Sequence, residues 1–148
     1  MNIKNYTSQI PPQKSVAQIE SCLVKIGARH ISKTYEDGKL AGITFQIIEN
    51  GEPIIFKLPA NVKGIQCAMT ETVKRPRRNT VTKIAQQAER TAWKLLLDWV
   101  QVQTSMVVIG RRNIIEVFLP YAYDMRADMT LFDKLQGNGF KMLESGDK

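Results

Sequence analysis

The amino-acid sequence predicts one α+β domain in two layers: a helix, a three-stranded antiparallel meander, and then two or more helices, one of them long. Three observations support this prediction. Apolar residues recur at helical spacing before residue 27 and after residue 60, whereas they alternate with polar residues between about 29 and 58. Two turn dipeptides, Asp37-Gly38 and Asn50-Gly51, interrupt that alternation. A chain of 148 residues is long enough for one core, so we treat residues 1–148 as a single domain.

The first elements are an extended segment and a helix, before the meander that ends at residue 58. Residues 1–13 are polar and end in Pro11-Pro12, which favours an extended backbone. Ser15 and Gln18 have the spacing of a capping box, which predicts a helix start. Gly27 is expected to end this helix. The apolar face of the helix is expected to consist of Val16, Ile19, Leu23 and Ile26.

The alternating stretch predicts three strands with one apolar face and one polar face. The apolar face is expected to carry Ala41, Ile43, Phe45, Ile47, Ile54, Phe56 and Leu58. The polar face is expected to carry Thr44, Gln46 and Lys57, with Lys33 as a further candidate. Pro59 should close the sheet, because proline cannot donate to a strand ladder.

Two helices are expected in residues 60–107, joined by a basic connector over 74–79. Asn61 is the predicted cap of the first helix, which should reach about Val73, and Asn79 or Thr80 is the predicted cap of the second, over 80–107. The first helix should face inward through Val62, Ile65, Ala68 and Met69. The second has an apolar stripe formed by Val81, Ile84, Ala88, Ala92, Leu95, Trp99, Val102 and Met106.

The length of this second helix predicts a homo-oligomer, most simply a dimer. At 1.5 Å per residue it would span roughly 40 Å, more than a three-stranded meander covers. A second apolar line runs along its middle, through Trp93, Leu96, Leu97 and Val100. We expect the C-terminal segment, a second copy or both to cover this line, and we favour a homo-oligomer with Trp93, Leu96 and Val100 partly at the interface. In that segment, Pro120 excludes a long regular element, and MTLFDKLQ predicts a short helix ending at Gly137.

The net charge and composition limit the classes of partner that we expect. Lys and Arg outnumber Asp and Glu by 21 to 14, giving a net charge of +7, which favours nucleic acid, nucleotide phosphate or an acidic protein as partner; a merely solubilising charge is the alternative. No apolar run reaches the roughly 18 residues of a membrane span, and the first residues lack a secretory signal. We therefore expect a cytoplasmic protein, with Cys22 and Cys67 as buried free thiols, a disulfide between them being the alternative, and with His30 as an isolated histidine.

The sharpest functional signal is the sequence KRPRR at residues 74–78. Arginine forks match phosphate geometry, and a following helix N-terminus adds partial positive charge. The predicted phosphate or nucleic-acid contacts are Lys74, Arg75, Arg77, Arg78, Lys83, Arg90, Lys94, Arg111 and Arg112. Contact with an acidic protein and a simply solvated loop remain open alternatives.

The aromatic and acidic residues give weaker indications of function than the basic cluster does. Tyr121 and Tyr123 are candidates for base stacking, whereas Trp93 and Trp99 fit the core better at their helical spacing. Asp124 and Asp128 are expected in turns or caps, and Glu89 and Asp98 are expected to pair with nearby cations. No phosphate-binding loop, nucleophile motif or convergent ligand set is present. We therefore expect no catalytic residue, no cofactor and no metal site.

The segments KNYTSQIP, FKLPANV, QAERTAWKLLLDWVQVQ and EVFLPYAYD together resemble a family of small uncharacterised proteins from bacteriophages and prophages. The resemblance covers nearly the whole chain and implies a phage setting in a host cytoplasm. In shape, the α-β-β-β-α order with a basic, Ala-rich last helix is similar to double-stranded-RNA-binding domains. Arg77, Arg78, Lys83, Ala85, Ala88 and Ala92 occupy comparable places, but the helix at 61–73 and the length of the 80–107 helix depart from that pattern.

Two functional hypotheses follow. The first is a non-enzymatic phage protein that binds nucleic acid through the basic arm and the long helix. The second is an anti-defence protein, which either inhibits a CRISPR or other immune effector or sequesters a nucleotide immune signal. Both need a phosphate-facing basic surface or a host protein as partner, so charge alone does not separate them.

Overall fold

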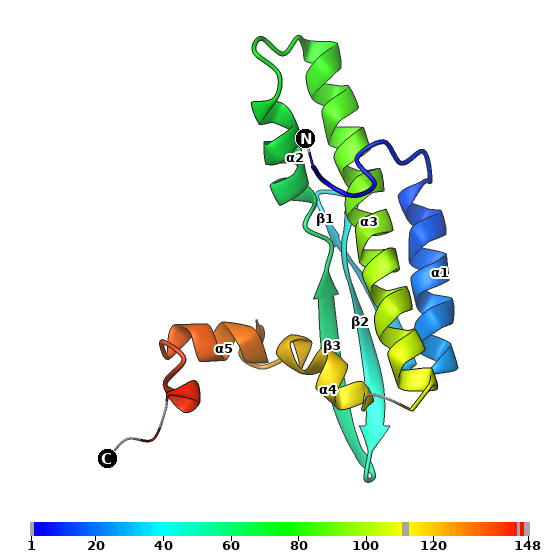
Figure 1. Ribbon diagram of the computed structural model, residues 1–148, viewed down its shortest axis with the longest axis vertical. Helices are drawn as coiled ribbons and strands as arrows, with labels where there is room; N and C mark the ends of the chain where they lie inside the picture. Colours follow the sequence, from blue (N-terminus) through cyan, green and yellow to red (C-terminus); the bar gives the residue numbers. More distant parts are fainter. Residues whose placement is uncertain (1, 111–112, 145, 147–148) are drawn as a thin grey trace.

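The computed structural model describes residues 2–110, 113–144 and 146, and it has the predicted α+β architecture (Figure 1). The helices and strands are α1 (Pro12–Lys25), β1 (Arg29–Glu36), β2 (Lys39–Glu49), β3 (Glu52–Pro59), α2 (Val62–Glu71), α3 (Arg78–Val108), α4 (Ile114–Phe118), η1 (Leu119–Tyr121), β4 (Tyr123–Asp124), β5 (Met129–Thr130), α5 (Leu131–Gly137) and η2 (Lys141–Leu143).

The sheet is the meander that the alternation predicts, with strand order β1-β2-β3 and both pairs antiparallel. Asp37-Gly38 and Asn50-Gly51 form two-residue turns, in which all four residues have positive φ, between 50° and 81°. This is the turn geometry whose twist matches the flanking strands, and it explains why Asn, Asp and Gly stand there.

One face of the sheet is covered by helices, and it holds the core. Figure 1 shows α1 and α3 side by side across this face. Phe45 and Phe56 are fully buried under them, with ring centroids 5.3 Å apart. Lys33 was a candidate for the opposite, polar face, but it pairs in register with the buried Ile43 and so lies on the helix-covered side. There its ammonium group meets Glu20 of α1 at 3.3 Å.

Three helix starts test the capping predictions. Asn61 caps α2 as predicted, because its side chain accepts a hydrogen bond from the backbone N–H of Gly64. The capping box at Ser15 is wrong: α1 begins at Pro12, where a fixed φ suits the first turn, and Ser15 is buried within the helix. The cap at Asn79 or Thr80 is also wrong, because α3 begins at Arg78.

The long helix α3 has 31 residues and packs between α1 and α2 (Figure 1). Trp93 and Val100 are fully buried within this single copy, so the prediction that they lie at an interface is wrong. They face the protomer core: the indole N–H of Trp93 donates to the carbonyl of Leu40 in β2 at 3.4 Å. Conversely, Trp99 is only partly buried, and Val102 is 60% exposed.

The chain after α3 leaves the helical layer and projects from the body. Phe118 anchors it, since its fully buried ring meets the rings of Phe45 at 5.3 Å and Trp99 at 5.7 Å. Ala122 then forms a bridge to Phe56 at the edge of β3. Residues 119–144, which we name the C-terminal arm, extend sideways from the sheet in Figure 1. As predicted, the regular elements around Pro120 are short and α5 ends at Gly137.

Candidate nucleic-acid interface

The basic cluster lies at one extreme end of the molecule. Lys74, Arg75 and Arg77 lie in the connection between α2 and α3, and Arg78 is the first residue of α3; Figure 1 places this connection beyond the sheet at the end of a helical hairpin. All four side chains are exposed. We name this group the basic tip.

The positive charges of the basic tip are not neutralised by any acidic side chain that the structure describes. None of its four side chains forms an ion pair or a side-chain hydrogen bond with any residue that the structure describes, including Glu71 at the end of α2. The first turn of α3 contains no acidic residue, and Arg77, its N-cap, provides no side-chain cap. The free N–H groups and partial positive charge of this helix end therefore add to the four cations. Such a surface attracts an anion.

The predicted cations further along α3 divide into two kinds. Lys83 is exposed and forms no ion pair with the described part of the chain, so it extends the basic tip by one helical turn. Arg90 and Lys94 instead have partners within the chain. The Arg90 side chain donates to the side-chain oxygen of Gln87 at 2.6 Å and to the backbone carbonyl of Ser8 at 3.3 Å.

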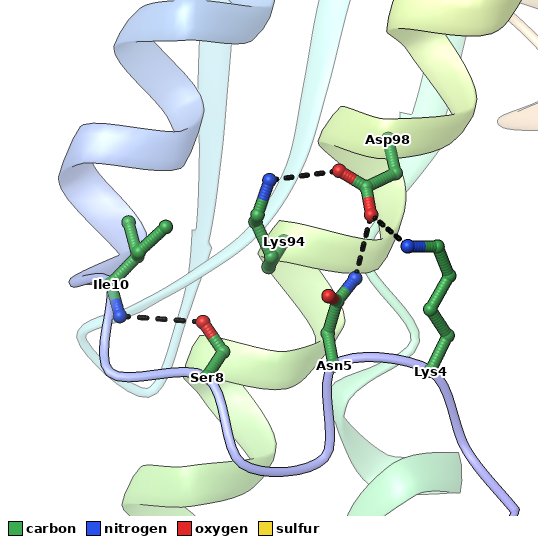
Figure 2. Close-up of polar contacts among 6 residues, drawn as sticks. All are labelled: Lys4, Asn5, Ser8, Ile10, Lys94 and Asp98. Atoms are coloured by element: carbon green, nitrogen blue, oxygen red, sulfur yellow. Dashed lines mark hydrogen bonds and ion pairs between the residues drawn. The ribbon is translucent and has the colours of Figure 1, made fainter.

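Lys94 belongs to a polar cluster that fastens the N-terminal segment to α3 (Figure 2). Its ammonium group donates to one oxygen of Asp98 at 2.8 Å, while Asn5 and Lys4 reach the other oxygen at 2.8 and 2.9 Å. Gln87 donates to the carbonyls of Tyr6 and Ser8, at 3.0 and 2.9 Å. Residues 4–8 thus form a strap across α3, a role that the sequence pattern did not reveal.

The carboxylate of Asp98 on α3 accepts polar contacts that hold this strap. Its partial burial by itself raises the pKa of the carboxyl, but the hydrogen bonds from Asn5, Lys94 and Lys4 outweigh burial and hold the pKa well below its ordinary range. The carboxylate is therefore ionised throughout the neutral range. This confirms the expectation that Asp98 pairs with nearby cations, and Glu89 likewise pairs with Lys39 at 3.1 Å.

The two candidate stacking tyrosines lie at the root of the C-terminal arm, and both are partly buried. The Tyr121 ring packs edge-on against Trp99, with centroids 5.5 Å apart. The Tyr123 hydroxyl donates a short hydrogen bond to Asp128, and this bond, the largest cause, raises the pKa of the phenol. The Lys57 ammonium group lies 4.9 Å from the Tyr123 ring centroid and 3.8 Å from Asp128. These contacts hold both rings beside a cleft of about 390 Å³.

The acidic residues of the arm serve local structure, as the sequence predicts. The Asp124 side chain accepts hydrogen bonds from the backbone N–H groups of Arg126 and Ala127 and pairs with Lys134 at 2.7 Å. These contacts hold the pKa of Asp124 below its usual value, the bond from Lys134 contributing most. Asp133 forms a capping box with Thr130 at the start of α5. Within the described residues, no three His, Cys, Asp or Glu side chains are grouped to hold a metal ion.

Two predicted contacts and one apolar groove complete the description of this region. Arg111 and Arg112 lie outside the described residues. An apolar groove of about 460 Å³ lies where α3 meets α2 and η1, and Leu95, Leu96, Trp99 and Val102 of α3 contribute to its lining. Three of these residues belong to the apolar stripe that the sequence predicts. The helical pattern could not show that this part of the stripe stays uncovered.

Comparison with known proteins gives no relative: no family model, no curated protein and no solved structure matches this chain. The resemblances to a phage protein family and to double-stranded-RNA-binding domains thus gain no support. Among the helices that the structure describes, none combines the length and apolar character needed to cross a membrane.

Proposed function

We propose that this protein binds nucleic acid without catalysing a reaction, and that the basic tip makes the principal phosphate contacts. The observation that carries the proposal is the combination of four exposed, internally unpaired cations with the uncapped N-terminus of α3. Lys83 extends this surface along the helix. Arginine and lysine at such a surface bind phosphate oxygens through charge-assisted hydrogen bonds.

A polymer fits the basic tip better than a single small nucleotide. The cations are exposed and lie at the projecting end of a helical hairpin (Figure 1), where an extended chain can approach them from solvent. A chain of phosphates can contact several separated cations at once and releases a counterion at each contact. A phosphate contact of this kind orients the protein without reading bases, so we expect little sequence preference from the tip itself.

The test is a binding titration with labelled single- and double-stranded DNA and RNA of increasing length. The triple variant Arg75→Ala, Arg77→Ala and Arg78→Ala should lower affinity by about a hundredfold, at roughly 1 kcal/mol for each lost contact. The slope of log affinity against log salt should fall by about 2–3.

The matched control removes the same charge elsewhere. Lys14, Lys25 and Arg29 are exposed, lie on α1 and β1, and have no ion pair with a described residue. Their triple Ala variant should change affinity by less than about fivefold, through long-range electrostatics alone. If the two triple variants lose the same affinity, the basic tip contributes to binding only through the net charge of the protein. Saturable binding of a mononucleotide with no gain from polymer length would contradict the proposal.

A further inference from the structure

Two apolar surfaces of this chain lie uncovered next to one another. The first is the groove where α3 meets α2 and η1, and the second is the C-terminal arm. Soluble proteins seldom leave such contiguous apolar surfaces free unless they bind something. Together these two surfaces contain a large share of the exposed apolar side chains among the described residues.

The groove is a continuation of the α3 stripe. Leu95, Trp99 and Val102 follow one another at helical spacing, and Ile65 of α2 forms the opposite wall. Among the described residues, the charged ones in its lining are Lys4 and Asp98, which form an ion pair of 2.9 Å. From Trp99 to Gly110 the sequence contains no charged residue at all.

The C-terminal arm is the second exposed apolar surface. Its exposed large apolar residues are Leu119, Met125, Phe132, Phe140, Met142 and Leu143. Phe132 and Phe140 meet each other at 5.9 Å, and the main contacts of α5 are with η1 and β5 of its own segment, with an ion pair from Lys134 to Asp124 of β4. A unit of this size buries too little apolar surface to hold its shape alone, so it needs a further surface to pack against.

Beyond Tyr121, the arm does not contribute to the groove of its own copy. Its root is fixed to β3 by the bridge between Ala122 and Phe56 and by the Lys57–Asp128 ion pair, and from there it points away from the body (Figure 1). The lining of the groove accordingly ends at Tyr121, and no residue of α5 or η2 contributes to it. The groove and the part of the arm beyond Tyr121 therefore lie side by side, and α5 and η2 do not line the groove.

We propose that two copies of this chain form a symmetric dimer, in which the arm of each copy packs into the α3 groove of the other. A two-fold axis beside the groove makes both contacts at once, so neither apolar surface remains free. The partner is a second copy rather than an unrelated protein because this chain itself carries both complementary surfaces. The proposal does not depend on nucleic-acid binding.

Charge supports the same partner. Each copy carries a net charge of +7, so repulsion between two copies is weakest where their contact surfaces carry no excess cations. The uncharged stretch from Trp99 to Gly110 meets this requirement. The basic tip lies at the N-terminal end of α3, away from this stretch at its C-terminal end (Figure 1). Both tips should therefore stay accessible in the proposed dimer.

Light scattering of the full chain at high micromolar concentration tests the proposal. The wild type should show twice the monomer mass of 16.8 kDa. Val102→Glu in the groove and Met142→Arg in the arm should each raise the dimer dissociation constant at least tenfold. These positions are 60% and 80% exposed, so the fold should survive, which circular dichroism checks. Val24→Glu on α1 is the matched control, because Val24 is 59% exposed on another surface, and it should leave the dimer intact.

Mixing the two variants distinguishes an exchanged arm from any other dimer. A mixed pair contains one unaltered arm and groove, and in its second contact the two introduced side chains, which have opposite charges, meet each other. The mixture should therefore regain the wild-type mass although neither variant does so alone. A monomeric wild type would overturn the proposal. So would a Met142→Arg protein that stays dimeric, or a mixture that stays monomeric.

Discussion

The side chain of Asn5 donates a hydrogen bond of 2.8 Å to the carboxylate of Asp98, across 93 residues of sequence. This contact joins the N-terminal strap to the middle of α3, next to the ion pairs from Lys4 and Lys94 (Figure 2). It explains why a polar line interrupts an otherwise apolar helix surface. The line on α3 is a fastening site for the strap.

The Asp98→Asn variant should lower the free energy of unfolding at neutral pH by about 1–2 kcal/mol, because it removes charge-assisted hydrogen bonds from a largely buried acceptor. The share of Lys4 is small, since its side chain is 67% exposed and solvent screens the pair. Urea unfolding measures the loss. Hydrogen exchange should show faster exchange in residues 4–8, while β2 exchanges as in the wild type. Unchanged protection of the strap would contradict this role.

The low pKa of Asp98 also predicts how stability depends on pH. A carboxyl whose pKa is depressed in the folded state stabilises the fold above its ordinary value of about 4, and this contribution is lost as the pH falls toward the folded-state pKa. The stability difference between wild type and Asp98→Asn should therefore be full at pH 6 and shrink below about pH 4. Urea titrations at several pH values measure this difference. A difference that stays constant down to pH 2 would exclude the ionised carboxylate as its source.

The two tryptophans should respond differently to truncation. Trp93 is fully buried between α3 and the sheet, so Trp93→Ala should cost about 3–5 kcal/mol through the cavity it leaves. Trp99 is partly exposed and packs edge-on against Phe118 and Tyr121, so Trp99→Ala should cost about 1–3 kcal/mol. Chemical denaturation of both variants tests the order. An equal or larger loss at Trp99 would contradict the expected order.

Ser15 offers a stabilising substitution. Its hydroxyl oxygen is fully buried in α1 and has no hydrogen-bond partner among the described residues. Ser15→Ala removes this unsatisfied group and improves helix propensity, so it should raise the free energy of unfolding by about 0.5–1.5 kcal/mol. The control is Ser21→Ala on the exposed side of the same helix, which gains the propensity term alone. Thermal and urea unfolding compare the two.

The turn between β2 and β3 depends on its glycine. Gly51 has a φ of +81°, so Gly51→Ala should cost about 1–2 kcal/mol through backbone strain, although nothing lies near the added methyl group. Gly137, in the last turn of α5, is equally open but lacks a positive φ. Gly137→Ala should therefore be neutral or slightly stabilising. A comparison of unfolding midpoints checks both, and equal losses would rule out backbone strain as the cause.

The sequence by itself determined the local structure. Strand alternation and the two turn dipeptides specify the meander, because a side-chain period of two and positive φ at Asn50, Gly51 and their counterparts are properties of short segments. The same holds for the helix at Asn61 and for the basic tip, whose exposure follows from its proline and its charges. These features depend on neighbours within a few residues.

Only the tertiary structure decided which helix surfaces are covered and by what. Two apolar lines on α3 look alike in sequence, yet Trp93 and Val100 lie in the core, whereas Val102 remains exposed. Likewise, Arg90 and Lys94 are cations like those of the basic tip, but Arg90 donates to Ser8 of the strap and Lys94 pairs with Asp98, which also binds the strap. Which of two equivalent surfaces is buried depends on contacts between residues up to 93 positions apart, and a periodic pattern records only spacing along one helix.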